Sequence, residues 1–157
     1  MSEHRATIRW QHSGGEFLKG IYSRMHSWTF DGGLTVPAAP APANVPVAFG
    51  NPANVDPEEA LVAALSSCHM LTFLFLAYRA GFRVESYEDE AVGQMEKNES
   101  GVSWISKVTL HPKIVYGPPE SPTPAEEAEL HHHAHEQCII ANSVKTEVVV
   151  HGGGNSQ

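Results

Sequence analysis

A long and almost uninterrupted apolar stretch ends at Gly81, and it predicts one long buried helix. The start of this helix is well marked. Asp56 is a favourable N-cap residue, Pro57 suits the first helical position, and Glu59 completes a capping box. A glycine suits the C-terminal end of a helix. We therefore expect a central helix over about 57–80.

The same stretch is long enough to resemble a membrane span, but polar residues interrupt it. Two serines, His69 and Arg79 lie within it, and acidic residues precede it. Ionisable side chains inside a membrane are rare and costly. We therefore interpret the stretch as the core helix of a soluble protein that does not bind membranes.

The segments before and after this helix show the alternation that is typical of strands. Residues 5–36 contain Gly-rich turn signals between short apolar runs, which predicts an N-terminal antiparallel meander. Residues 37–55 are rich in proline and alanine and predict a long surface loop. Residues 83–116 predict two long antiparallel strands with a turn near 98–101.

A second helix is predicted over about 124–141, because Thr123 and Glu126 repeat the capping pattern around a proline at the first helical position. A last strand is expected at about 144–151. The order of these elements is typical of an α+β protein with antiparallel sheets packed around a central helix. A chain of 157 residues is the length of a single domain, so we expect one domain over 1–157.

Composition narrows the function classes. The net charge is −8 and no basic patch is present, which argues against nucleic acid as a partner. The first ten residues are mixed polar and charged rather than a signal peptide, so we expect a cytoplasmic protein. Two cysteines do not form the disulfide framework of a secreted domain.

The two cysteines are the main candidates for chemistry. Cys68 lies in the middle of the apolar helix. On the second helix, Leu130, Ala134 and Cys138 recur at three- and four-residue steps and therefore share one apolar face. If the two helices pack together, the two thiols can meet. Buried inert cysteines are the common alternative.

A reactive thiol must ionise, and a nearby cation favours the thiolate. His69 follows Cys68 directly, but neighbours on a helix diverge by about 100°. Arg24, in the predicted strand "IYSRMHSW", is the better candidate because a guanidinium keeps its charge when buried. His26 would lie on the same strand face as Arg24.

These residues carry a resemblance to a known family. "DPEEALVAALSSCHM", followed by "EQCIIANSVKTEV" and preceded by an arginine in an early strand, resembles the OsmC/Ohr family, named after osmotically inducible protein C and organic hydroperoxide resistance protein. The resemblance covers nearly the whole chain. It implies an intertwined homodimer of α+β fold with two sites at the interface. It also implies a thiol-dependent peroxidase that reduces organic hydroperoxides and hydrogen peroxide in oxidative-stress defence.

The resemblance also implies roles for single residues. Cys68 matches the peroxidatic cysteine, which forms a sulfenic acid, and Cys138 matches the resolving cysteine. Arg24 matches the arginine that stabilises the thiolate, with Arg5 and Arg9 as alternatives. We expect no organic cofactor, and we assign no metal site because a closed zinc site needs four ligands and the sequence shows no obvious fourth. An external dithiol protein, of the lipoyl type by analogy with relatives, would reduce the disulfide.

The acid of the family matches Glu58, which would hold Arg24. In a straight helix, ten residues separate Glu58 from Cys68 by about 15 Å along the axis. One arginine can hardly contact both within one chain. We therefore predict that Glu58 serves the Cys68 site of the partner subunit.

Two other functions remain open. His131 and His135, with Cys138 three residues further on, have a spacing that suits a metal-binding or redox-sensing module, although a polar helix face with incidental histidines is the simpler interpretation. A non-catalytic binder of small ligands is the other alternative. The sequence departs from better-known members of the family at His69 and Met70, and these two residues, with His26, are candidates for the wall of a substrate pocket.

Overall fold

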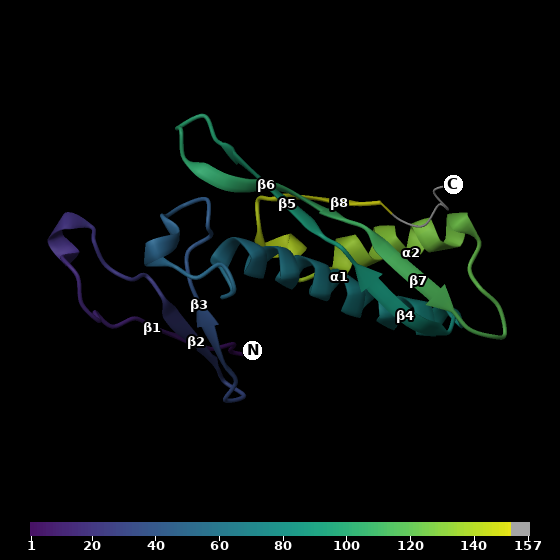
Figure 1. Cartoon of the computed structure of the whole chain (residues 1–157). Coiled ribbons are helices and arrows are strands. Elements are labelled where there is room, and N and C mark those ends of the chain that lie inside the picture. The colour runs from purple at the N-terminus through teal and green to yellow at the C-terminus, as the bar shows by residue number, and fades with distance from the viewer. Residues whose placement is uncertain (152–157) are drawn as a thin grey trace. The chain divides into compact units, whose positions relative to one another are not determined.

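The computed structural model describes residues 1–151 (Figure 1). The contacts divide the chain into two compact units, which meet at Ala60 and Leu61 inside the central helix. The first unit holds the N-terminal strands, and the second holds the rest of the helix and everything that follows it. The expectation of one domain over 1–157 stays a prediction.

The first unit contains the predicted antiparallel meander. Its strands β1 (Ala6–Arg9), β2 (His26–Phe30) and β3 (Thr35–Ala38) lie in the order β1-β2-β3 (Figure 1). Ile8 and Val36 both pair with Trp28 of the middle strand. The turn between β2 and β3 contains Gly33 at a φ of 88°, a conformation that favours glycine.

The connection from β1 to β2 differs from the expected Gly-Gly turn. It is a long loop with a 3₁₀ helix, η1 (Phe17–Lys19). Trp10 closes this loop because its indole N–H donates to the Ser23 carbonyl oxygen at 2.9 Å, and its ring packs on those of Phe17 and Tyr22. Arg24 therefore lies in this loop and not on a strand, so its predicted strand position is wrong.

The central helix α1 runs from Pro57 to Ala80, as predicted. The expected capping box is present: the Glu59 backbone N–H donates to Asp56 at 2.8 Å, and the Asp56 backbone N–H donates to Glu59 at 2.9 Å. Gly81 follows the helix with a φ of 89°.

Only one face of α1 is fully buried. Residues on this face recur every fourth position: Leu65, His69, Phe73 and Ala77. Leu71, Phe75 and Tyr78, on the other side, are exposed. By length and composition alone α1 is apolar enough to cross a membrane, and the expectation of a buried core helix holds for its packed face.

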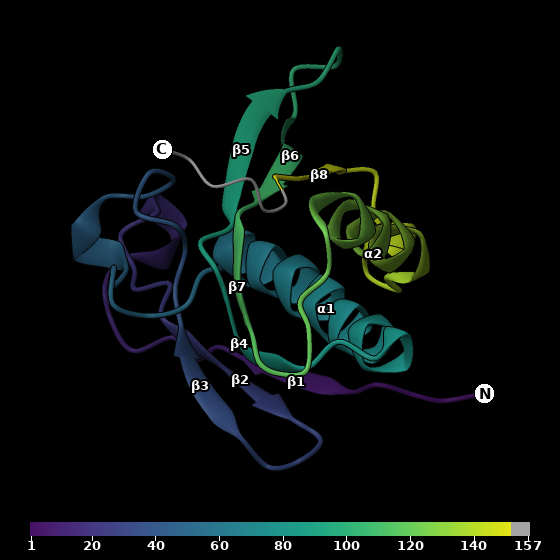
Figure 2. The ribbon, with the colours of Figure 1, turned by 90° about the vertical axis from the view of Figure 1, so that its right-hand side faces the viewer.

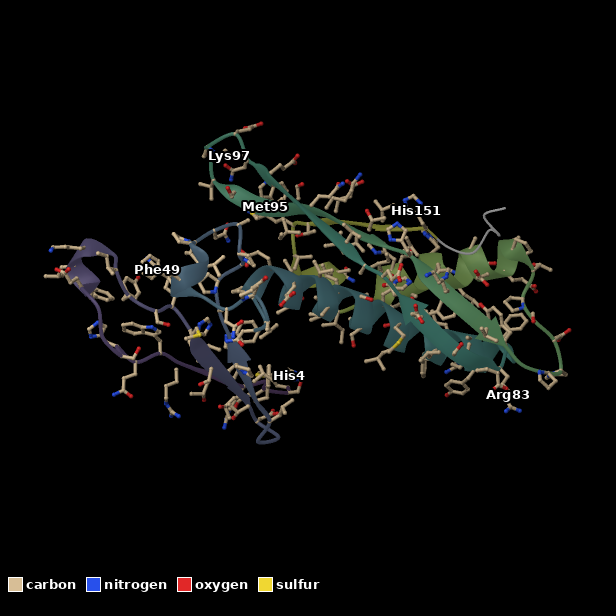
Figure 3. The ribbon with its side chains drawn as sticks, viewed as in Figure 1. His4, Phe49, Arg83, Met95, Lys97 and His151 are labelled. Atoms are coloured by element: carbon tan, nitrogen blue, oxygen red, sulfur yellow. The ribbon has the colours of Figure 1, made fainter. Side chains whose placement is uncertain are left out.

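The two long strands expected over 83–116 are each broken once. The breaks give two separate pairings, β4–β7 and β5–β6. At the break, Asp89 accepts a hydrogen bond from the backbone N–H of His111 at 2.6 Å, which takes that donor away from the ladder. The turn lies near 98–101 as predicted, beyond Lys97 at the tip of the hairpin (Figure 3). The four strands are β4 (Val84–Asp89), β5 (Val92–Lys97), β6 (Ser103–Leu110) and β7 (Pro112–Tyr116).

The second helix α2 (Pro124–Gln137) starts with the predicted Thr123–Glu126 capping box but ends before Cys138. A turn and a 3₁₀ helix, η3 (Ala141–Ser143), follow it. The last strand β8 (Glu147–Val150) pairs with β6 in parallel. The sheets are therefore not purely antiparallel. A parallel neighbour needs a long connection, and the segment that contains α2 provides it between β7 and β8.

The core of the second unit forms between α1 and its neighbours. Leu65 packs with Val108 and Leu110 of β6. Phe73 and Ala77 pack with Ala134, so α2 lies beside α1 (Figure 2). This packing of the two helices brings their inward-facing polar side chains together.

Candidate functional site

The two thiols meet in the core of the second unit. Cys68 is half-buried on α1, Cys138 is fully buried at the C-terminal end of α2, and both are free thiols. The Cys68 thiol lies close enough to Cys138 to raise the pKa of Cys138. The proximity expected from the sequence is therefore present within one chain, although Cys138 caps α2 instead of lying inside it.

A tight turn fixes Cys138. Its sulfur accepts a hydrogen bond from the Ala141 backbone N–H at 3.4 Å, and its carbonyl oxygen accepts one from the Asn142 side chain at 2.9 Å. Burial, followed by the neighbouring Cys68 thiol, raises the pKa of Cys138 to about 11. Cys138 is therefore protonated at neutral pH.

The predicted arginine and its neighbours lie in the first unit. Arg24 is half-buried, and its guanidinium donates to the carbonyl oxygens of Tyr22 at 3.2 Å and Gly20 at 3.3 Å. The guanidinium carbon also lies 4.2 Å from the centre of the Tyr22 ring and 5.4 Å from that of Phe49. His26 begins β2, and its ring N–H donates to the Arg24 carbonyl oxygen at 2.9 Å.

The alternative arginines are more exposed. Arg5 pairs with Glu3 on the surface, and Arg9 is exposed at the end of β1. Arg24 is the only one of the three that is half-buried.

Glu58 stands in the first turn of α1. One of its carboxylate oxygens accepts a hydrogen bond from the Asn44 side chain at 2.8 Å, and the other is buried without a hydrogen-bond partner among residues 1–151. Sequence reasoning missed Asn44, which lies in the proline-rich segment that was expected to be only a surface loop. Because α1 runs unbroken, Glu58 and Cys68 are separated by about 15 Å along its axis.

His69, a candidate for the wall of a substrate pocket, is one half of a buried histidine pair. Its Nε2 lies 3.0 Å from Nδ1 of His131, and the two ring planes differ by 10°. The Phe73 ring stacks on His131, with 4.4 Å between ring centres. Only 1% of His69 and 4% of His131 is exposed. Met70, the other candidate from this part of α1, is half-buried.

The interpretation of the histidine cluster as a polar helix face is wrong for His131 and right for two others. His132 and His133 are turned outward, where they pair with Glu136 and Glu129. The spacing of His131, Ala134 and Cys138 along α2 was the available signal, because these three residues share the buried face.

Both buried histidines are neutral. Burial, followed by the nearby His135, lowers the pKa of His69 to about 4, while Asp89 acts weakly in the opposite direction. Burial, followed by His69, lowers the pKa of His131 to about 4. At pH 7 the pair therefore holds two uncharged rings.

This pair predicts a loss of stability in mild acid. A histidine whose pKa is lowered by folding binds its proton more readily in the unfolded chain, so stability is full above about pH 6.5 and falls towards pH 4. One such imidazole lowers the unfolding free energy at pH 5 by roughly 2 kcal/mol relative to pH 7. Urea unfolding at pH 7 and pH 5 measures this effect.

A double variant isolates the contribution of the pair. In His69→Leu/His131→Leu the difference in unfolding free energy between pH 7 and pH 5 should shrink by roughly 4 kcal/mol, because two such imidazoles are removed. The exposed His132→Gln variant should keep the wild-type difference. An undiminished difference in the double variant would show that other groups cause the acid sensitivity.

The metal-binding alternative finds no support in this geometry. Within residues 1–151, no group of three His, Cys, Asp or Glu side chains is arranged to hold a metal ion. His131 contacts His69, and Cys138 contacts Cys68.

Comparison with known proteins identifies the family. Residues 50–151 match the family model of OsmC-like proteins. An OsmC-like protein of unknown function from Vibrio cholerae is 50% identical, over 96% of this chain and 98% of that one, with a TM-score of 0.92. No curated protein matches the chain.

More distant structures share the fold. An organic hydroperoxide resistance protein from Bacillus subtilis is 23% identical, over 95% of each chain, with a TM-score of 0.64. One from Legionella pneumophila is 18% identical, over 96% of this chain and 94% of that one, with a TM-score of 0.68. With its α+β fold and its matches to the family model and the Vibrio protein, the chain belongs to the OsmC-like family.

Proposed function

We propose that this protein is a thiol-dependent peroxidase that reduces organic hydroperoxides, with Cys68 as the peroxidatic and Cys138 as the resolving cysteine. The observation that carries the proposal is the proximity of the two free thiols inside one chain. Cys68 is partly open to a reactant, while Cys138 is buried behind it. The names of the distant relatives from Bacillus subtilis and Legionella pneumophila support the same activity.

The reaction balances with these two residues and one dithiol. The Cys68 thiolate attacks the distal oxygen of the hydroperoxide, the O–O bond breaks, and the alcohol leaves after taking up a proton. The Cys138 sulfur then attacks the sulfur of the Cys68 sulfenic acid. The S–S bond forms, and the hydroxyl leaves as water with the proton that Cys138 gives up. Two thiol hydrogens of an external dithiol restore the starting state.

Arg24 would stabilise the Cys68 thiolate and orient the peroxide. A guanidinium suits this task because it stays charged when buried and donates several hydrogen bonds. The unpaired buried oxygen of Glu58 offers an acceptor for such a guanidinium. The length of α1 between Glu58 and Cys68 favours the arrangement in which Glu58 serves the site of a partner subunit in a homodimer.

By analogy with the family, the reductant would be a dithiol of the lipoyl type. No organic cofactor would be needed, and the mixed polar composition of the first ten residues favours action in the cytoplasm. His26 and Met70 stay candidates for the wall of the substrate pocket.

Turnover with a chemical dithiol tests this function. Wild-type protein should consume cumene hydroperoxide catalytically when dihydrolipoamide is supplied, and hydrogen peroxide can be compared in the same assay. Cys138→Ser should turn over at least about tenfold more slowly, because the sulfenic acid has lost its internal partner. Ser67→Ala, on the exposed side of α1 beside Cys68, is the matched control and should behave like wild type.

Absence of turnover in wild-type protein would refute the peroxidase proposal. In that case, saturable binding of cumene alcohol or a similar apolar ligand would favour the small-ligand binder.

A further inference from the structure

The buried histidine pair has an unusual hydrogen-bonding state. The two inner nitrogens, Nε2 of His69 and Nδ1 of His131, are 3.0 Å apart. The two outer nitrogens, Nδ1 of His69 and Nε2 of His131, are buried and have no hydrogen-bond partner among residues 1–151. Unpartnered buried polar atoms each cost about 1–3 kcal/mol, so two leucines would stabilise this core better. Stability alone does not explain the pair.

The chemistry of neutral imidazole makes the two ends of the pair different. Each neutral ring carries one N–H and one lone pair. Because one hydrogen occupies the inner bond, one outer nitrogen must carry an N–H and the other must carry a lone pair. A proton that enters at the lone-pair end and another that leaves from the N–H end convert both rings to the opposite tautomer. The pair can therefore pass a proton along without holding a charge.

The surroundings connect this pair with the thiols. On α1, His69 directly follows Cys68. On α2, His135 lies close enough to His69 to influence its pKa, and its own Nδ1 is buried and unpartnered. His135 also accepts a hydrogen bond at its carbonyl oxygen from the Cys138 backbone N–H at 3.3 Å. His135 thus stands one helical turn from Cys138, on the side of the histidine pair.

The third element packed here is β4. The charge of its Asp89 favours the protonated form of His69. The Asp89 carboxylate already accepts hydrogen bonds from the Ser66 hydroxyl and the His111 backbone N–H. The Tyr87 hydroxyl is buried, and burial followed by the charge of Asp89 raises its pKa above the usual value, so it stays neutral. We assign the thiol proton to neither group, because Asp89 already accepts two hydrogen bonds and the neutral Tyr87 hydroxyl keeps its own proton.

We propose that His69 and His131, with His135 as the link to Cys138, form a proton relay for the resolving step. This inference rests on the proposed peroxidase function. Cys138 must lose its proton as its sulfur bonds to that of Cys68. The proton enters the relay at a lone pair, and the N–H at the far end supplies a proton to the hydroxyl group that leaves as water. The products are one disulfide and one water, and the relay is left in its other tautomer.

Two variants separate a relay from a structural role. In His131→Gln, the side-chain amide can still hydrogen-bond to His69 but cannot exchange tautomers. His69→Leu/His131→Leu removes both rings and their unpaired nitrogens while keeping an apolar core of similar volume. The matched control is His132→Gln, which changes the exposed histidine next to His131.

Rapid quenching after one equivalent of cumene hydroperoxide, followed by intact mass, follows both steps. Sulfenic acid should form at the wild-type rate in all variants. Disulfide should form at least about tenfold more slowly in His131→Gln and in the double variant, so that sulfenic acid accumulates. This deficit should narrow as the pH rises towards the pKa of Cys138, because hydroxide then removes its proton directly. Wild-type disulfide rates in both variants, or equal slowing of both steps, would overturn the relay.

A second oxidant keeps this test independent of the peroxidase proposal. Diamide takes up the two thiol hydrogens and closes the disulfide without any peroxide. If wild-type protein ignores cumene hydroperoxide but is oxidised by diamide, the peroxidase proposal fails while the relay is still tested. Slower closure by diamide in His131→Gln than in His132→Gln would support the relay, and equal rates would refute it.

Discussion

Replacing Cys68 with serine is expected to reduce the consumption of cumene hydroperoxide to the rate seen without protein. A hydroxyl at this position is far less acidic than a thiol and forms no sulfenic acid, so the first step is lost. Serine is close to cysteine in size, and Cys68 is only half-buried, so the fold should persist. Peroxide consumption with dihydrolipoamide measures the loss, and circular dichroism checks the fold.

Cys138→Ser provides the comparison. It should still consume about one equivalent of hydroperoxide rapidly, because Cys68 remains, and should fail only in the resolving step. Peroxide turnover by Cys68→Ser at more than a small fraction of the wild-type rate would mean that Cys68 is not the peroxidatic residue.

Replacing Phe73 with alanine is expected to cost about 3–5 kcal/mol of unfolding free energy. Phe73 is fully buried between the two helices, stacks on His131 and contacts Tyr87, with 5.8 Å between ring centres. Its removal leaves a cavity beside the histidine pair. Urea unfolding at pH 7, where both histidines are neutral, isolates this packing effect from their titration.

Val115→Ala is a suitable control for this loss, because Val115 is 56% exposed on β7. Its cost should stay below about 1 kcal/mol. A similar small cost for Phe73→Ala would mean that the interface between α1 and α2 is not a tightly packed core.

The helices were the most predictable part of the fold. Asp56, Glu59, Thr123 and Glu126 form local capping contacts, and such contacts depend on residues only three positions apart. The proximity of Cys68 and Cys138 was also predictable, because Cys138 shares the apolar face of the second helix and Cys68 lies in the middle of the long apolar helix available to pack against it. The family resemblance reinforced this interpretation.

The positions that depend on distant contacts were not predictable. Arg24 was expected on a strand, but Trp10 reaches Ser23 across thirteen residues and closes a loop around it. The strand breaks depend on Asp89, which bonds to His111 from the neighbouring strand. The parallel entry of β8 depends on where α2 packs, which no local signal contains.

The pairing of His69 with His131 was missed for a related reason. His69 was considered against Cys68, its neighbour along the chain, while its partner lies sixty-two residues away on the other helix. The four-residue spacing that places His69 between Leu65 and Phe73 on α1 was visible in the sequence. It could have indicated an inward-facing histidine in need of a polar partner.

The central claim is that Cys68 and Cys138 form one redox couple within a chain. Intact mass with thiol counting, after one equivalent of cumene hydroperoxide, tests it most directly on wild type and Cys138→Ser. The account predicts loss of two hydrogens and both thiols in wild type, and one added oxygen in the variant. Two free, unmodified thiols in the wild-type protein would contradict it.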